Sequence, residues 1–145
     1  MTSWVVVDSN IFLSLVIPDE NTSKSKAIIR LWHKNQIQLA APTLFQYEAV
    51  AVIRKQRGRG NLTPDESQKA LHFMFRQKIT LFVSKELHYR AFEFANQFNF
   101  STAYDSQYLA LAEHLNCEFW TIDRRIVNIV NPALSWVKYL GDFTP

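Results

Sequence analysis

Short apolar runs alternate with stretches of helical spacing along the whole chain. The apolar runs predict strands at residues 5–7, 37–40, 79–83, 118–122 and 135–140. Apolar residues recurring every three or four positions predict helices at residues 11–16, 22–32, 42–58, 64–77, 85–99, 101–115 and 124–130. Parallel strands need crossovers, which helices usually provide. The alternation therefore predicts an α/β fold, with helices on both faces of a mostly parallel sheet of five strands.

The length and composition fit one compact domain over residues 1–145. The chain has 145 residues, is 48% hydrophobic and contains only three glycines, so disorder is excluded. Cys117 is a single cysteine and cannot form an internal disulfide. The N-terminus lacks a signal-peptide pattern, and the apolar stretch at residues 11–18 is far shorter than the ~20 residues that span a bilayer. We expect a cytoplasmic protein with no membrane segment.

The net charge of +3 hides a basic middle segment and an acidic C-terminal third. Residues 54–90 contain nine basic and three acidic side chains, whereas residues 91–145 contain three basic and six acidic ones. One part of the surface could therefore bind a polyanion that another part processes. The alternative is that these charges only solvate helix faces. The nearest basic cluster to the candidate chemistry consists of Arg54, Lys55, Arg57 and Arg59.

Two predicted strands end directly in an aspartate. Asp8 follows the run at residues 5–7, and Asp123 follows the run at residues 118–122. In an open α/β sheet, ligands bind outside the carboxyl ends of the strands. The two carboxylates share one edge if these strands are neighbours. Each aspartate could instead only cap the helix that follows it.

Two further carboxylates lie within predicted helices. Glu48 is three or four positions from Leu44, Phe45, Ala51 and Val52, which predicts that it shares their apolar face and needs a tertiary partner or a cation. The alternative is an edge position where its carboxylate reaches water. Asp105 follows Thr102 by three residues, so it could be the acidic member of a capping box.

Four carboxylates meeting at one edge would repel each other, which indicates a divalent cation. Mg²⁺ or Mn²⁺ fits best, because these ions prefer carboxylate and water oxygens and can activate water against a phosphate. Zinc is poorly supported, because the four histidines are scattered and Cys117 stands alone. No glycine-rich phosphate loop is present.

Four segments together carry a resemblance to a known family. They are VVVDSNIF at residues 5–12, YEAV at 47–50, YDSQYLALAE at 104–113 and TIDRR at 121–125. In order, spacing and placement they resemble the PIN domain, particularly the VapC-type ribonuclease toxins of prokaryotic toxin–antitoxin pairs. The resemblance covers the whole chain. Ser106 and Ile122 stand where that family often has alanine.

The resemblance implies a three-layer PIN-like fold and a Mg²⁺- or Mn²⁺-dependent endoribonuclease. It implies that Asp8, Glu48, Asp105 and Asp123 form the catalytic, metal-binding quartet, with Asn10 and Thr121 as polar positions beside it. It also implies an RNA substrate, a homodimer and a small cognate antitoxin of the VapB type. Besides the basic cluster at residues 54–59, Arg124 and Arg125 are weaker candidates for RNA contact.

Three other functions stay open from sequence alone. A haloacid-dehalogenase-type phosphatase also begins with a strand ending in aspartate, but it needs a second acid where this chain has Asn10. The others are a PIN nuclease for RNA maturation outside toxin–antitoxin pairs, and a non-catalytic RNA-binding domain.

The first two predicted helices also offer a possible partner site. They are rich enough in apolar residues to suggest an exposed groove for a partner helix. The alternative is that these residues all pack on the sheet or in a homodimer interface. They are Ile11, Phe12, Leu13, Leu15, Val16, Ile28, Ile29, Leu31 and Trp32.

Overall fold

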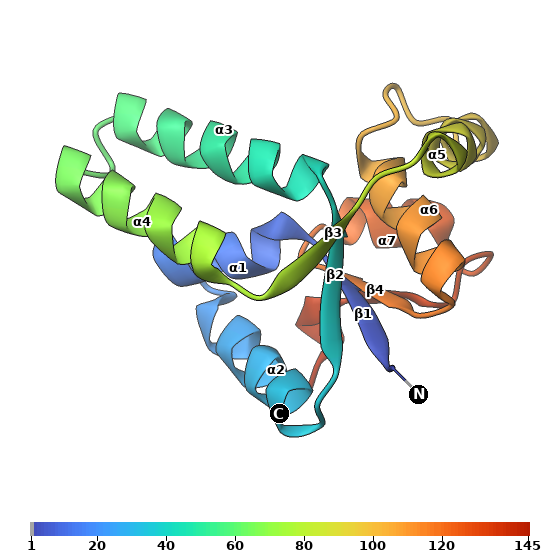
Figure 1. Cartoon of the computed structure of the whole chain (residues 1–145), viewed down its shortest axis with the longest axis horizontal. Helices are drawn as coiled ribbons and strands as arrows, with labels where there is room; N and C mark the ends of the chain where they lie inside the picture. The colour runs from blue at the N-terminus through green and yellow to red at the C-terminus, as the bar shows by residue number, and fades with distance from the viewer. Residues whose placement is uncertain (1) are drawn as a thin grey trace.

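The computed structural model describes residues 2–145, and its centre is a five-stranded sheet (Figure 1). All neighbouring strands pair in parallel, in the order β3-β2-β1-β4-β5. The α/β fold with a parallel five-stranded sheet is therefore confirmed. The strands are β1 (Trp4–Val7), β2 (Gln38–Pro42), β3 (Ile79–Phe82), β4 (Glu118–Thr121) and β5 (Val137–Tyr139).

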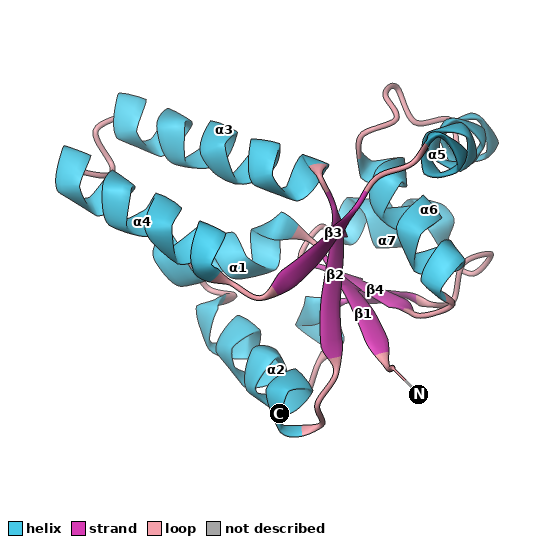
Figure 2. Cartoon of the chain, in the orientation of Figure 1, coloured by secondary structure: helices cyan, strands magenta, loops and turns pink. Residues whose placement is uncertain are grey.

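Seven α-helices connect the strands of the described chain, and one 3₁₀ turn follows the last strand. Helices α1 to α4 lie on one face of the sheet and α5 to α7 on the other (Figure 2). This division follows from right-handed crossovers, because the chain moves outward from β1 to β3 and then returns through β4 to β5. The helices are α1 (Ser9–Val16), α2 (Thr22–Lys34), α3 (Leu44–Gly58), α4 (Pro64–Arg76), α5 (Lys85–Gln97), α6 (Asp105–Leu115), α7 (Arg124–Val130) and η1 (Leu140–Asp142).

Local signals in the sequence explain where several elements begin. Thr63 and Glu66 form a capping box at the start of α4, with Pro64 in the first turn, as the sequence predicts. Ser84 caps α5 by accepting a hydrogen bond from the Leu87 N–H. The central strand β1 is apolar and buried from Val5 to Val7, as a strand covered on both faces must be.

Three details of the sequence prediction are wrong. Helix α6 begins at Asp105 instead of residue 101, and Tyr104 occupies its N-cap without a side-chain bond. Thr102 makes no capping box, because the loop after α5 takes Thr102 to the cavity beside Glu48. Pro42 is the last residue of β2, where it pairs with Phe82, and does not open a helix.

The buried stripe of α3 also differs from the prediction. It consists of Phe45, Ala49 and Ile53, which are four residues apart, whereas Ala51 is exposed. Glu48 is one position from Ala49 and therefore lies half-buried at the edge of this stripe. At this position the methylene groups of Glu48 can pack against the core while its carboxylate extends out of it.

The proposed apolar groove on the first two helices does not exist. Helix α1 contacts α2, α3 and α4, which together cover most of its apolar residues. Only Leu31, with 42% of its surface exposed, is open to solvent, and Leu15 and Val16 are half-buried. The other six predicted groove residues, Ile11, Phe12, Leu13, Ile28, Ile29 and Trp32, are buried.

Two further features concern the length of the helices and the order of the strands. Within residues 2–145, no helix is long and apolar enough to cross a membrane. The strand order reverses between β1 and β4, so the carboxyl ends of these two strands form the topological switch point of the sheet. Ligands of open α/β sheets bind at such points.

Candidate active site

Asp8 and Asp123 follow the two strands at the switch point. Strands β1 and β4 are neighbours, and the Asp8 N–H extends their pairing by donating to the Trp120 carbonyl at 3.0 Å. Both aspartates also cap helices: Asp8 accepts from the Asn10 N–H at 3.3 Å, and Asp123 accepts from the Arg125 N–H at 2.9 Å. Capping and a shared edge are therefore compatible, and capping fixes each carboxylate at the edge.

The hydroxyl of Thr121 connects the two strand ends. It donates to Asp8 Oδ2 at 2.8 Å and accepts from Asn10 Nδ2 at 3.2 Å and from the Asp123 N–H at 3.0 Å. Asn10 Oδ1 in turn accepts from the Ile122 N–H at 3.3 Å. Thr121 is fully buried, so this network holds the Asp8 carboxylate in one orientation.

Glu48 reaches the same edge from α3. Its Oε1 accepts from the Tyr108 hydroxyl at 2.5 Å and from Ser9 Oγ at 3.2 Å. Ser9 Oγ also lies 3.5 Å from Asp8 Oδ1, so Ser9 stands between the two carboxylates. Tyr108 is almost fully buried in α6, and its ring stacks on Phe119 with centroids 5.2 Å apart. These contacts are the tertiary partners that a half-buried Glu48 requires.

Asp105 and Asp123 share one cation. Arg125 Nη2 lies 3.4 Å from Asp105 Oδ2 and 3.3 Å from Asp123 Oδ2. The Arg125 side chain is mostly exposed, so this bridge is weakly held and screened by salt. Arg125 therefore holds the second pair of carboxylates together, while Ser9 joins the first pair.

Burial and mutual repulsion make three of the four carboxylates hard to ionise. Burial, followed by the charge of Glu48, raises the pKa of Asp8 to about 7. Burial also raises the pKa of Glu48, although the Tyr108 and Ser9 hydrogen bonds oppose the rise. For Asp105, burial raises the pKa against the opposing charge of Arg125. Each of these carboxylates is also affected by another member of the group, so the four acids form one electrostatic cluster.

The donor chemistry of this cluster fits a hard divalent cation. In residues 2–145, no Lys, Arg or His forms an ion pair with Asp8 or Glu48, and all the candidate ligands are carboxylate oxygens. In that same part of the chain, no three acidic, histidine or cysteine side chains stand close enough to enclose an ion as they are arranged here. The cluster therefore offers a suitable donor set whose side chains would have to close around a cation.

The candidate RNA-binding side chains divide into two locations. Arg54, Lys55, Arg57 and Arg59 are exposed at the far end of α3, which extends away from the sheet beside α4 (Figure 1). Arg124 lies over the ring of Tyr139, with its guanidinium carbon 4.5 Å from the ring centroid. Arg125 faces the acids, as described above.

Ser9 and Tyr108 are site residues that the sequence reasoning missed. Ser9 had a signal, because it follows Asp8 at the start of a helix and must lie close to it. Tyr108 follows Asp105 by three positions and so lies on the same side of α6. Its place in the apolar run of residues 108–112 is instead typical of a core residue.

Comparison with known proteins places this geometry in a family. Residues 5–131 match the family model described as PIN domain. The chain is 28% identical over 125 residues to "Ribonuclease VapC3" of Pyrobaculum aerophilum, an alignment that covers 84% of this chain and 91% of that protein.

Solved structures share the fold. A toxin–antitoxin complex from Klebsiella pneumoniae has a chain with a TM-score of 0.66 at 15% identity, covering 94% of this chain and 97% of that one. VapBC2 from Rickettsia felis, bound to a DNA fragment from its promoter, gives 0.65 at 14% identity, covering 87% and 92%. The family match at residues 5–131 includes every residue that builds the acidic edge, from Asp8 to Arg125. This chain belongs to the PIN-domain family.

Proposed function

We propose that the protein is a Mg²⁺- or Mn²⁺-dependent endoribonuclease and the toxin of a toxin–antitoxin pair. The observation that carries the proposal is the Asp8–Ser9–Glu48 arrangement at the switch point of a PIN-domain sheet, where two carboxylates meet and no basic side chain of residues 2–145 pairs with either. The relative named as a ribonuclease supports an RNA substrate. The fold shared with chains of toxin–antitoxin complexes supports the pairing with an antitoxin.

The members of the cluster divide two tasks between them in this proposal. Asp8 and Asp105, with Asp123 directly or through a water, would hold the cation. When bound, the cation supplies Lewis-acid polarisation of the phosphate and a more acidic water. Ser9 and Tyr108 fix Glu48 Oε1, so that its other oxygen is left to orient the attacking water and accept its proton. Thr121 and Asn10 hold Asp8 in the orientation that this site needs.

Metal-dependent cleavage of RNA is the direct test. Purified protein is expected to cut total RNA with Mg²⁺ or Mn²⁺ and to stop in EDTA, and sequencing of the new ends would identify the substrate and site. Cleavage in EDTA would contradict the metal dependence. Binding of RNA without cleavage under any condition would favour a non-catalytic domain instead.

The same assay separates the toxin from an RNA-processing nuclease. The product of a small open reading frame beside the gene is expected to co-purify with the protein and to suppress cleavage. A basic side chain of such an antitoxin could enter the cluster at Asp8 and Glu48, which form no ion pair within the described part of the chain. If the complex cleaves RNA as fast as the free protein, the nuclease assignment stands and the toxin–antitoxin assignment is wrong.

The helix geometry of α3 ranks the four basic residues at its end. At about 100° per residue, Lys55 and Arg59 lie within about 20° of the direction of Glu48, whereas Arg54 and Arg57 point more than about 100° away. Lys55 is about 10 Å and Arg59 about 16 Å further along the helix than Glu48. We therefore expect Lys55 and Arg59 to contact the RNA strand that leaves the acidic cluster.

Salt dependence of RNA binding tests this ranking. Replacing Lys55 and Arg59 together with glutamine is expected to lower the slope of log K against log salt by about 1.4, because each lost phosphate contact on a single strand removes about 0.7. The Arg54→Gln, Arg57→Gln double variant is the matched control, since it removes the same charge from the other sides of the helix. Equal slopes in the two double variants would show that only net charge matters.

A further inference from the structure

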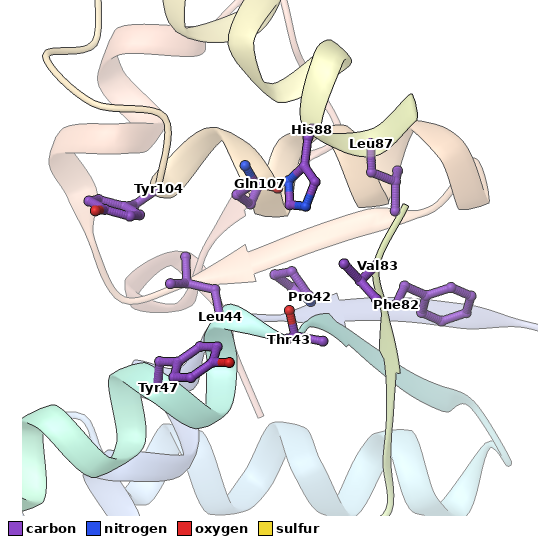
Figure 3. Close-up of a pocket in the computed structure, with 10 residues that line it drawn as sticks. All are labelled: Pro42, Thr43, Leu44, Tyr47, Phe82, Val83, Leu87, His88, Tyr104 and Gln107. Atoms are coloured by element: carbon purple, nitrogen blue, oxygen red, sulfur yellow. Dashed lines mark hydrogen bonds between the residues drawn. The ribbon is translucent and has the colours of Figure 1, made fainter. Parts of the chain in front are cut away.

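A small apolar cavity opens beside the acidic cluster. It lies where the start of α3 meets the end of β3, and α5 and α6 close its far side (Figure 3). Its volume is about 250 Å³, slightly below the roughly 300–1,000 Å³ that is usual for drug-sized ligands. Leu44, Val83 and the rings of Tyr47 and Tyr104 supply much of its apolar lining. A single flat ring system is a suitable occupant by size.

The cavity is continuous with the acidic cluster. Leu44, Tyr47 and Tyr104 also line the neighbouring depression that contains Glu48 and Asp105. In Figure 3, Tyr47 and Tyr104 lie on the same side of the cavity, with Leu44 between them in that view. A chain molecule bound over the carboxylates can therefore extend from the acidic cluster onto these two rings.

The lining combines open aromatic faces with a few polar groups. Tyr47 and Tyr104 are 72% and 63% exposed, so their ring faces are open to a ligand at the mouth of the cavity. Along the upper edge of the cavity in Figure 3, next to Tyr104, His88 Nδ1 and Gln107 Oε1 are 3.1 Å apart. No hydrogen bond in residues 2–145 uses the Gln107 amide donors. No Lys, Arg, Asp or Glu lines the cavity, so a phosphate has no counter-charge there.

We infer that this cavity binds one unstacked nucleobase of the RNA strand, next to the phosphate that lies at the acidic cluster. The inference rests on the proposed ribonuclease function. Proteins recognise single-stranded RNA by stacking splayed bases on aromatic side chains and by hydrogen-bonding their edges. Tyr47 and Tyr104 provide the stacking surface, and Gln107 with His88 reads the base edge. The cavity is thus a specificity site beside the scissile bond.

An abasic scan tests the inference separately from catalysis. Seven RNA heptanucleotides, each with one abasic residue at a different position, are titrated by fluorescence anisotropy in Mg²⁺ against protein in the Asp8→Asn background, which prevents cleavage. One abasic position is expected to weaken binding by about 5- to 150-fold, the range for loss of one base–aromatic stack. In Tyr47→Ala and Tyr104→Ala variants of that background, this positional effect is expected to disappear.

Two matched variants control for lost surface and lost hydroxyl groups. Tyr89 is as exposed as Tyr47, at 72%, but does not line the cavity, so Tyr89→Ala is expected to keep the positional effect. Tyr104→Phe retains the aromatic ring and is therefore also expected to retain the positional effect. Gln107→Ala is expected to change which of the four bases is preferred at that position.

The outcomes separate three cases. A protein that binds none of the heptanucleotides overturns the ribonuclease proposal together with this inference. Binding that is equally sensitive at every position, or unaffected by either Tyr→Ala variant, overturns the base site alone. Light scattering of the same variants covers the remaining case: if Tyr47→Ala or Tyr104→Ala dissociates a dimer without changing the abasic profile, the cavity is a contact between two copies of the chain.

Discussion

Replacing Asp8 with asparagine is expected to reduce RNA cleavage by more than about a hundredfold while leaving the fold intact. Mutation of even an outer partner of a metal ligand commonly costs 10- to 100-fold, so loss of a carboxylate ligand should cost more. Asparagine has nearly the same shape and keeps one acceptor oxygen for the network of Asn10 and Thr121. Asp105→Asn is expected to act in the same direction.

The assay compares each variant with wild-type protein by initial rate of RNA cleavage in Mg²⁺ or Mn²⁺, beside a thermal melt. Asp65→Asn is the matched control, because Asp65 is an exposed aspartate of α4 that pairs only with Lys69. We expect wild-type activity from this control. Full activity of folded Asp8→Asn and Asp105→Asn proteins would exclude the carboxylate cluster as the catalytic site.

The positions of the strand-end acids could be predicted because they depend on general rules. A strand followed by a carboxylate places that carboxylate at the carboxyl end of the sheet. Whether the strand before Asp8 lies beside the one before Asp123 depends on the strand order, which the sequence leaves open and the structure supplies. Glu48 could be predicted less well. Its helix uses the stripe of Phe45, Ala49 and Ile53, and the alternative stripe including Ala51 has nearly the same period.

The apolar residues of the first two helices show the limit of such reasoning. A sequence reports how many apolar residues a helix has but not how many neighbours cover it. Helix α1 contacts three other helices, so most of the residues that looked excessive for one buried face are buried. Two of the most exposed rings are Tyr47 and Tyr104, which come from a helix and a loop that are far apart in sequence.

Tyr108 illustrates a second limit. Its ring contributes to the core by stacking on Phe119, and its hydroxyl fixes Glu48. One buried tyrosine therefore serves packing and the site at the same time. Burial and the charges of Asp8 and Glu48 raise the pKa of Tyr108 well above its ordinary value, so its hydroxyl stays a hydrogen-bond donor to Glu48. Apolar periodicity detects the first role only.

The stability of the metal-free protein is expected to fall as pH rises from about 4 to about 7. The pKa of Asp8 is about 7 in the folded protein and near 3.9 in an unfolded chain. Between these values the folded state retains a proton that the unfolded state has released, so each rise in pH favours unfolding. The full change corresponds to roughly 4 kcal/mol, or on the order of 10 °C in Tm. The raised pKa values of Glu48 and Asp105 act in the same direction.

Asp8→Asn and a divalent cation should each remove this loss of stability. Asparagine has no proton to release, so the variant is expected to exceed wild-type stability at pH 8 by roughly 3 kcal/mol, after about 1 kcal/mol for the weakened hydrogen bonds. Mg²⁺ at about 100 times its Kd is expected to stabilise wild-type protein by about 2.7 kcal/mol and the variant by much less. The measurement is urea unfolding at pH 4 to 8, with EDTA or Mg²⁺. A flat wild-type profile would show that Asp8 ionises freely, and equal stabilisation of both proteins by Mg²⁺ would place the cation away from Asp8.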